Sequence, residues 1–290
     1  MTHATRDAAS SRPVVRSPRF SWATTPRRWL AGSTAATHIA NGVNLLFPHG
    51  ERFFVRSVRH YLRDVDDATL AEDVRAFFGQ EGRHAGAHEA FFDVLREQGY
   101  EVDAFLVPYK RLSDRIEKAS PPALRLAVTA ALEHFTAILA EDALDGRMFE
   151  VAHPTVARLL AWHAVEELEH KAVAFDVLAR VAPSYLLRVA GMFLGAALLG
   201  SFWIMATREL LRQDGMSLVD AARDLRALRE RGEAAGLEPQ GPIATRVFLR
   251  GIREYLRPGF HPNDRDHREL IARTLALLET EGVVEARRAA

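Results

Sequence analysis

One short stretch, residues 163–170, does most to limit the folds open to this chain. It reads HAVEELEH. On a helix, His163, Glu167 and His170 stand at i, i+4 and i+7 and therefore share one face. Two imidazoles and a carboxylate that point the same way form a set of metal ligands. The stretch predicts a helix whose inward face binds metal.

A second ligand pair lies upstream, where Glu81 and His84 repeat the Glu-x-x-His spacing. Glu51 and Glu133 are single glutamates on apolar stripes of other predicted helices. Two Glu-x-x-His pieces and two further glutamates are the ligand inventory of a dinuclear site inside a four-helix bundle. Buried salt bridges are the alternative, but few Lys or Arg residues lie on these stripes to pair with the carboxylates.

The predicted ligand set has seven members, because His163 can reach the metal beside Glu167. They are Glu51, Glu81, His84, Glu133, His163, Glu167 and His170. We expect Glu133 and Glu167 to take part in catalysis as well. His88, Glu166 and His134 are predicted to lie behind the ligands and orient them. His88 could instead be a further ligand, and His134, which points about 100° away from Glu133, could be structural. Glu166 competes with Glu167 for the metal, and the Glu-x-x-His spacing favours Glu167.

Composition limits the metal and the partners. The chain contains no Cys, which excludes disulfides, thiolate sites and iron–sulfur clusters. Oxygen and imidazole ligands suit two iron ions, with manganese or zinc as alternatives. Its 38 basic and 38 acidic residues balance, so nothing indicates a nucleic-acid partner. The lack of Cys fits a reducing compartment, and we expect the protein in the cytoplasm.

Hydrophobic periodicity predicts an all-α chain in three parts. Residues 1–32 are rich in Arg, Ser, Thr and Pro. We interpret them as an N-terminal extension that packs Phe20, Trp22 and Trp29 on the bundle or stays partly disordered, rather than as a targeting peptide. Residues 33–182 form the predicted metal-binding bundle, and residues 183–290 form additional C-terminal helices. Bundle helices are expected over residues 33–47, 48–62, 66–98, 121–150 and 154–181, with a shorter connecting helix over 102–118. Asp66 and Asp67 mark the start of the helix over 66–98, Gly99 ends it, and Ser120 is the expected cap of the helix from 121.

An uncharged segment of 19 residues, 189–207, lies between Arg188 and Arg208. Its length is at the threshold for crossing a bilayer. Gly191 and Gly195 have the spacing that lets another helix approach closely. The segment predicts a membrane-associated helix, a buried helix of a soluble protein, or a helix that forms a homodimer.

Around the ligands, the chain resembles the ferritin-like di-iron carboxylate superfamily. It is similar to one family there, labelled "predicted metal-dependent hydrolase", over residues 15–265. The resemblance rests on LFPHGERFF at 46–54, QExxHxxxH at 80–88, LEHFT at 132–136 and WHxxEExEHK at 162–171. The spacing of His163, Glu167 and His170 is also similar to that of di-iron N-oxygenases. These resemblances imply a ferritin-like four-helix bundle in which the seven residues bind iron.

Three functions follow as expectations. The first is a di-iron oxidoreductase that activates O₂ to oxidise an apolar substrate, with electrons from a reductase. Its substrate would be lipid-like or aromatic, and the uncharged segment favours the lipid-like choice. The alternative is a hydrolase in which two metals activate water. An iron-handling ferroxidase ranks third, because the sequence has no acidic storage surface.

Overall fold

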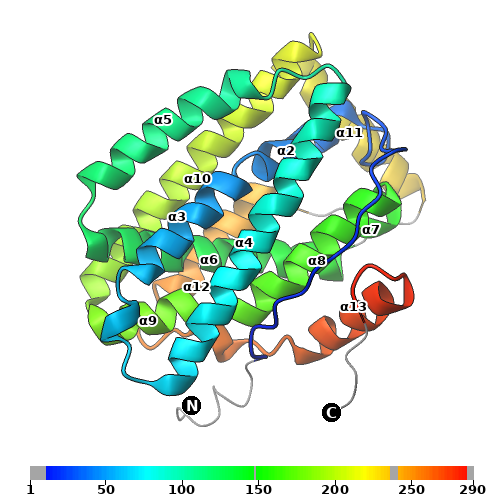
Figure 1. Ribbon diagram of the computed structural model, residues 1–290. Helices are drawn as coiled ribbons and strands as arrows, with labels where there is room; N and C mark the ends of the chain where they lie inside the picture. Colours follow the sequence, from blue (N-terminus) through cyan, green and yellow to red (C-terminus); the bar gives the residue numbers. More distant parts are fainter. Residues whose placement is uncertain (1–10, 147, 236–240, 286–290) are drawn as a thin grey trace.

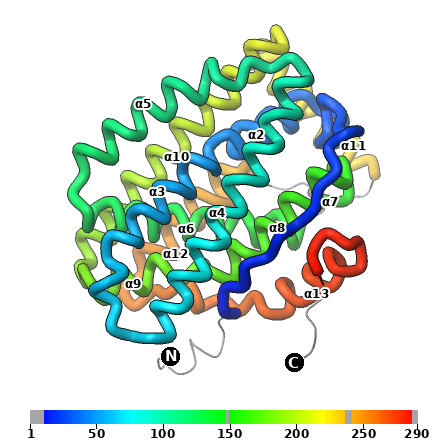
Figure 2. Tube along the Cα trace, in the orientation of Figure 1, coloured from blue at the N-terminus to red at the C-terminus, as the bar shows by residue number. Residues whose placement is uncertain are grey.

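The computed structural model describes residues 11–146, 148–235 and 241–285, and in these ranges every regular element is a helix (Figures 1 and 2). The all-α prediction is therefore confirmed for the described chain. The elements are α2 (Thr34–Asn44), α3 (Phe47–Arg59), η1 (Leu62–Asp64), α4 (Ala68–Glu97), α5 (Asp103–Ala119), α6 (Pro122–Asp145), α7 (Met148–Val151), α8 (Pro154–His170), α9 (Val173–Val181), α10 (Tyr185–Gln213), α11 (Leu218–Ala234), η2 (Ala244–Leu249), α12 (Arg250–Tyr255), η3 (Pro262–Asp264) and α13 (Arg268–Thr280).

Polar caps and prolines set the helix starts. Ser33 and Asp67 cap α2 and α4, and each side chain accepts a hydrogen bond from a backbone N–H in the first turn. Proline stands in the first turn of α3, α6 and α8, where its missing N–H costs nothing. Gly99 follows α4 with a φ of 90°, which favours glycine. The starts at Ser33 and Asp67 and the end at Gly99 match the sequence prediction.

Three helix boundaries differ from the prediction. Ser120 does not cap α6, because its hydroxyl donates to the carbonyl of Ile116 at the end of α5. The helix expected over 121–150 ends before Gly146, and the short α7 follows it. The helix expected over 154–181 is divided after His170, where the Lys171 ammonium turns to the carbonyl of Arg265.

Four helices enclose the centre of the molecule. α3 packs on α4 and α6 packs on α8, while α3 also contacts α6 and α4 also contacts α8 (Figure 1). α9 extends the α8 side and contacts both α4 and α6. Each of the four central helices therefore turns one face toward a shared interior, as a helical bundle requires.

The N-terminal residues 11–30 form a strap across this bundle. In Figures 1 and 2 the strap runs in dark blue along α4 and α8 toward α7. Trp29 is buried with its ring edge against Phe91, and the Phe20 ring lies 6.0 Å from that of Trp162. Arg16 reaches the carboxylates of α8. The segment is thus packed onto the bundle, as the strap interpretation of the sequence predicts.

The uncharged segment 189–207 lies within α10, which packs on α2 and α6. A Cβ atom at Gly191 would lie 2.5 Å from the backbone of Ala127 in α6, so only glycine allows this approach. Gly195 faces Ala131 one turn further along α6. The small-residue spacing therefore serves helix packing inside the chain.

Two described helices are long and apolar enough to cross a membrane by length and composition. α6 is mostly buried in the protein, as the core helix of a soluble protein would be. α10 leaves more of its surface open, including Phe193 and Ile204. Length and composition are weak grounds for a membrane span, so membrane association through α10 and a cytoplasmic location both stay predictions.

Candidate metal centre

All seven predicted ligands converge in the interior between α3, α4, α6 and α8. Each is at most 4% exposed. α3 contributes Glu51, α4 contributes Glu81 and His84, α6 contributes Glu133, and α8 contributes His163, Glu167 and His170. Four helices therefore supply four carboxylates and three imidazoles to one buried cluster.

One half of the cluster is formed by Glu81, Glu133 and His170. His170 Nε2 lies 3.2 Å from Glu81 Oε1 and 3.2 Å from Glu133 Oε2. The donor atoms of this trio lie within 4.8 Å of one another. Two carboxylates and an imidazole at this spacing can hold a metal ion.

The other half is formed by His84, His163 and Glu167, with Glu51 beside them. His163 Nε2 lies 2.8 Å from Glu167 Oε1 and 3.7 Å from Glu51 Oε1. The other oxygen of Glu167 lies 3.5 Å from His170 Nε2 in the first half. The two oxygens of Glu167 thus face the two halves, the position of a carboxylate that can serve two ions.

The outward ring nitrogen of each histidine is also held. His84 Nε2 lies 3.1 Å from Glu166, His163 Nδ1 lies 2.6 Å from His88, and His170 Nδ1 lies 2.9 Å from Gln80. Asn44 in turn contacts the far nitrogen of His88. A partner on the outer nitrogen fixes the ring orientation and the tautomer of a metal-binding histidine.

The strap supplies a cation that the sequence analysis did not assign to the site. Arg16 donates to Glu169 at 2.7 and 2.9 Å and to Glu166 at 3.3 Å. Glu169 also accepts from Gln80 at 2.9 Å. Glu169 belongs to the HAVEELEH stretch, so its position on the predicted ligand helix was the available signal. Nothing in the sequence around Arg16 indicates a partner 150 residues away.

His134 does not join the cluster, although it follows Glu133. Its Nε2 lies 3.2 Å from the carbonyl of Gly251, and its ring packs against Tyr255 and Phe260. Adjacent helical residues point about 100° apart, so His134 faces α12 when Glu133 faces the bundle interior. Burial lowers the pKa of His134 to about 4, and the ring is therefore neutral. This position fits the structural alternative for His134 better than a role that orients the ligands.

Burial disfavours the charged form of three of the four central carboxyl groups. It raises the pKa of Glu51 and Glu81 well above the ordinary range, and the nearby Glu167 and Glu133 carboxylates add to the effect. Burial raises the pKa of Glu133 to about 7, although His170 opposes the change. Without a cation, these groups would carry protons near neutral pH.

Glu167 and His170 are the charged pair of the cluster. Burial disfavours the Glu167 carboxylate, yet His170 and His163 hold its pKa well below the ordinary value. Burial likewise opposes a charged His170, but Glu167 and Glu133 raise its pKa. Burial and the neighbouring His163 lower the pKa of His84 and His88. The neutral His84 is ready to bind a metal through nitrogen.

The fit to metal rests on buried atoms that have no hydrogen-bond partner within the described residues. Both oxygens of Glu51, Glu81 and Glu133 are in this state, as are Glu167 Oε2, His84 Nδ1 and His170 Nε2. Buried polar atoms are nearly always satisfied, so a cluster of unsatisfied carboxylate and imidazole atoms is unusual. Divalent cations would satisfy them together, which hydrogen bonds within the chain do not.

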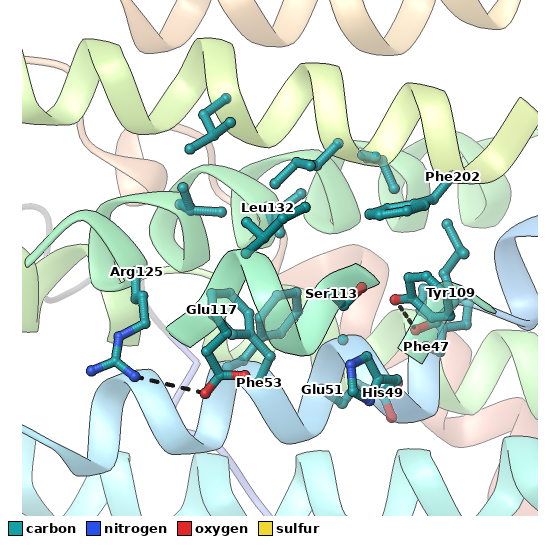
Figure 3. Close-up of a pocket in the computed structure, with 18 of the residues that line it drawn as sticks. Phe47, His49, Glu51, Phe53, Tyr109, Ser113, Glu117, Arg125, Leu132 and Phe202 are labelled. Atoms are coloured by element: carbon teal, nitrogen blue, oxygen red, sulfur yellow. Dashed lines mark hydrogen bonds and ion pairs between the residues drawn. The ribbon is translucent and has the colours of Figure 1, made fainter. Parts of the chain in front are cut away.

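Two apolar cavities touch the cluster. The Glu51 cavity, about 110 Å³, lies between α3, α5, α6 and α10 and is lined by Phe53, Tyr109, Leu132 and Phe202 among others (Figure 3). The Glu167 cavity, about 440 Å³, reaches both His163 and Glu167 from the side of α2 and α11. Access to the ligands is therefore through apolar walls.

Comparison with known proteins agrees with this geometry. A family described as "Predicted metal-dependent hydrolase" matches residues 14–266. The chain belongs to this family. No curated protein and no solved structure matches it. The family supports an enzyme that needs metal, and it favours the hydrolase alternative over the oxidoreductase that the sequence analysis placed first.

Proposed function

We propose that the chain is a dinuclear metal enzyme whose ions are held by the seven clustered residues in a ferritin-like four-helix arrangement. Two groups of ligands support this proposal, and the two oxygens of Glu167 face one group each. Each of the four central helices contributes at least one ligand. The unpartnered oxygens of Glu51, Glu81 and Glu133 carry the proposal. Iron fits the mixture of carboxylate and imidazole, and manganese and zinc fit it as well.

The reaction that we propose first is hydrolysis of an apolar substrate. Bound metal would supply Lewis acidity and lower the pKa of a bound water. Glu51 lines one cavity and Glu167 lines the other, so these two carboxylates are placed to hold or accept a proton beside the substrate. Glu133 lines neither cavity. Glu51 therefore replaces Glu133 in the catalytic pair expected from sequence, while Glu167 keeps its role.

Oxidation with O₂ is the second candidate, and a specific observation favours it. Three imidazoles, those of His84, His163 and His170, face the cluster, and iron with such ligands and open positions activates O₂. The apolar walls would exclude water from the reaction. This candidate needs an electron donor as a partner.

Metal analysis with two activity measurements distinguishes the candidates. The purified protein is assayed for metal content and for hydrolysis of 4-nitrophenyl esters with apolar acyl groups. It is then reduced without oxygen, mixed with O₂ and followed by absorption spectroscopy. Two metal ions per chain with metal-dependent ester hydrolysis support the first proposal. Two irons with a transient visible band and no hydrolysis support the second, and a protein that binds no metal contradicts both.

A further inference from the structure

The two apolar cavities share one wall at the metal centre. Val43, Phe47 and Thr136 line both the Glu51 cavity and the Glu167 cavity. These three residues come from α2, α3 and α6. The cavities therefore approach the ligand cluster from two sides and are separated there by only a few side chains.

Phe47 is the largest side chain of this shared wall. Its ring centroid lies 4.6 Å from that of His163 and 4.8 Å from that of His88. Phe47 and Val43 are only half-buried, although they lie beside buried ligands. Both side chains line the two cavities.

Away from the ligand cluster, charged groups along the cavities form ion pairs. Glu117 lies in the Glu51 cavity, where Arg56 binds both of its oxygens at 2.9 and 2.7 Å and Arg125 lies 3.7 Å away (Figure 3). In the Glu167 cavity, Asp142 pairs with Arg246. The remaining walls are largely alkyl and aromatic, for example Leu160, Leu198 and Phe202. Such walls select an uncharged chain over a compact polar molecule.

We propose that the two cavities form one passage for a long unbranched apolar chain, and that Phe47 determines how far the chain extends past the metal centre. The inference rests on the proposed function, because it takes the ligand cluster as the reacting centre. It names the substrate class as an ester of a long alkyl or acyl chain, whose ester bond lies at the metal centre while the chain runs through the passage. Phe47 is then the residue that sets chain-length specificity.

Binding of n-alkanols from hexanol to octadecanol tests the passage. Displacement of the uncharged dye Nile red from the purified protein measures each affinity. In the wild type, affinity should increase roughly fourfold for each methylene buried, until the chain fills the Glu167 cavity and the increase stops. Phe47→Ala should extend the increase by at least three methylenes, which is roughly a 60-fold gain for the longest alcohols.

Two further variants keep the test decisive. Leu198→Ala enlarges the Glu51 cavity away from the shared wall. The affinity of this variant for alcohols should therefore stop increasing at the same chain length as in the wild type. Val43→Ala opens the same wall without removing the ring beside His163, and it should act like Phe47→Ala but more weakly. Circular dichroism and metal content establish that each variant is folded and loaded.

Three results would overturn the passage. The first is that no alcohol displaces the dye. The second is that the chain length at which affinity stops increasing is unchanged in folded Phe47→Ala and Val43→Ala. The third is that this chain length increases as much in Leu198→Ala as in Phe47→Ala. Metal content and turnover are measured separately from alcohol binding. A protein that binds chains as expected but holds no metal would refute the proposed function and leave the binding passage intact.

Discussion

Two glutamates on α6, eight positions apart, have opposite surroundings: Glu133 is fully buried, and the Glu141 side chain is 16% exposed. Glu133 faces the bundle interior, and no Lys or Arg forms an ion pair with it within the described residues. Glu141 pairs with Arg250, and Arg265 lies 2.8 Å away. Burial raises the pKa of Glu133 to about 7. Burial also opposes the charge of Glu141, but His267 and the two arginines lower its pKa to about 2.

The difference gives a way to distinguish a structural carboxylate from a proposed metal ligand. The charge of Glu141 is balanced by cations that the chain itself provides, so the group links α6 to α12 and to the segment before α13. The charge of Glu133 is balanced only in part by His170. A buried carboxylate without a cation is unfavourable, so Glu133 either keeps its proton or is neutralised by a cation from outside the chain, such as the proposed metal.

The largest effect is expected on metal binding. Glu133→Ala should weaken metal affinity at least about 100-fold, because losing a ligand costs more than losing a group that orients one. Glu141→Ala is the matched control on the same helix and should keep the wild-type metal content. Elemental analysis after dialysis measures both. Equal metal loss in the two variants would contradict the proposal that Glu133 binds metal and Glu141 does not.

Unfolding of the metal-free protein should show how much the buried Glu133 carboxylate destabilises the fold. The pKa of Glu133 is raised from 4.5 to about 7, so its contribution to stability is present below pH 4.5 and is lost as the pH rises through about 7. Metal-free Glu133→Gln should therefore be more stable than the metal-free wild type at pH 8, by about 2–3 kcal/mol. Urea unfolding at pH 4.5 and pH 8 measures the gap, which should be smaller at the lower pH. A gap that does not grow with pH would contradict this cause.

Glu166 provides a second comparison, because it lies next to the proposed ligand Glu167 but is predicted to orient His84 instead of binding metal. Burial raises the pKa of Glu166 to about 8, although Arg16 opposes the shift, and the side chain holds the outer nitrogen of His84. Glu166→Ala should lower metal affinity by about 10–100-fold and keep the number of bound ions. Titration of the metal-free protein with metal measures both quantities. Loss of a whole ion would instead make Glu166 a direct ligand.

The stabilising role of Glu141 should appear in acid. Its pKa is lowered from 4.5 to about 2, so the stability that it adds is present above pH 4.5 and is lost as the pH falls toward 2. Because the side chain is partly open to solvent, Glu141→Gln should cost only about 1–2 kcal/mol at pH 7. Chemical denaturation at pH 7 and pH 3 should show a smaller deficit at pH 3. A constant deficit would point to lost packing rather than lost charge.

The smallest effect is expected where a carboxylate is exposed. Arg52 and Glu89 form a bidentate pair at 2.7 Å between α3 and α4, and both side chains are 46% exposed. Arg52→Gln should cost less than about 1 kcal/mol, and the cost should fade in high salt. Thermal unfolding at low and high salt measures it. A larger cost that persists in salt would indicate that Arg52 acts through the adjacent Glu51.

Sequence spacing predicts the ligands that share a helix, because which residues share a face of an α-helix depends only on their spacing. Glu81 and His84 share a face on any helix, and so do His163, Glu167 and His170. The pairing of Gly191 and Gly195 was also visible, since small residues at this interval allow close helix contact. What the sequence left open was the partner, and the structure shows that it is α6 of the same chain.

Contacts between distant segments could not be predicted in this way. Arg16 meets Glu169 across 153 positions, and Glu141 meets Arg265 across 124. Nothing in the local pattern of either arginine indicates its carboxylate. The break after His170 was hidden for a similar reason, because the apolar pattern continues through residues 173–178 while the backbone turns. Tertiary contacts decide such features.

The strap over α4 and α8 has a consequence for the order in which the molecule assembles. Residues 11–30 leave the ribosome before α8, because the part of α8 that they bind is made well over a hundred residues later. Contacts of such long sequence separation form slowly. The strap should therefore dock as one of the last events of folding. Until then Glu166 and Glu169 would stand without Arg16, so a late intermediate would have an open, hydrated α8 where the finished protein is dry.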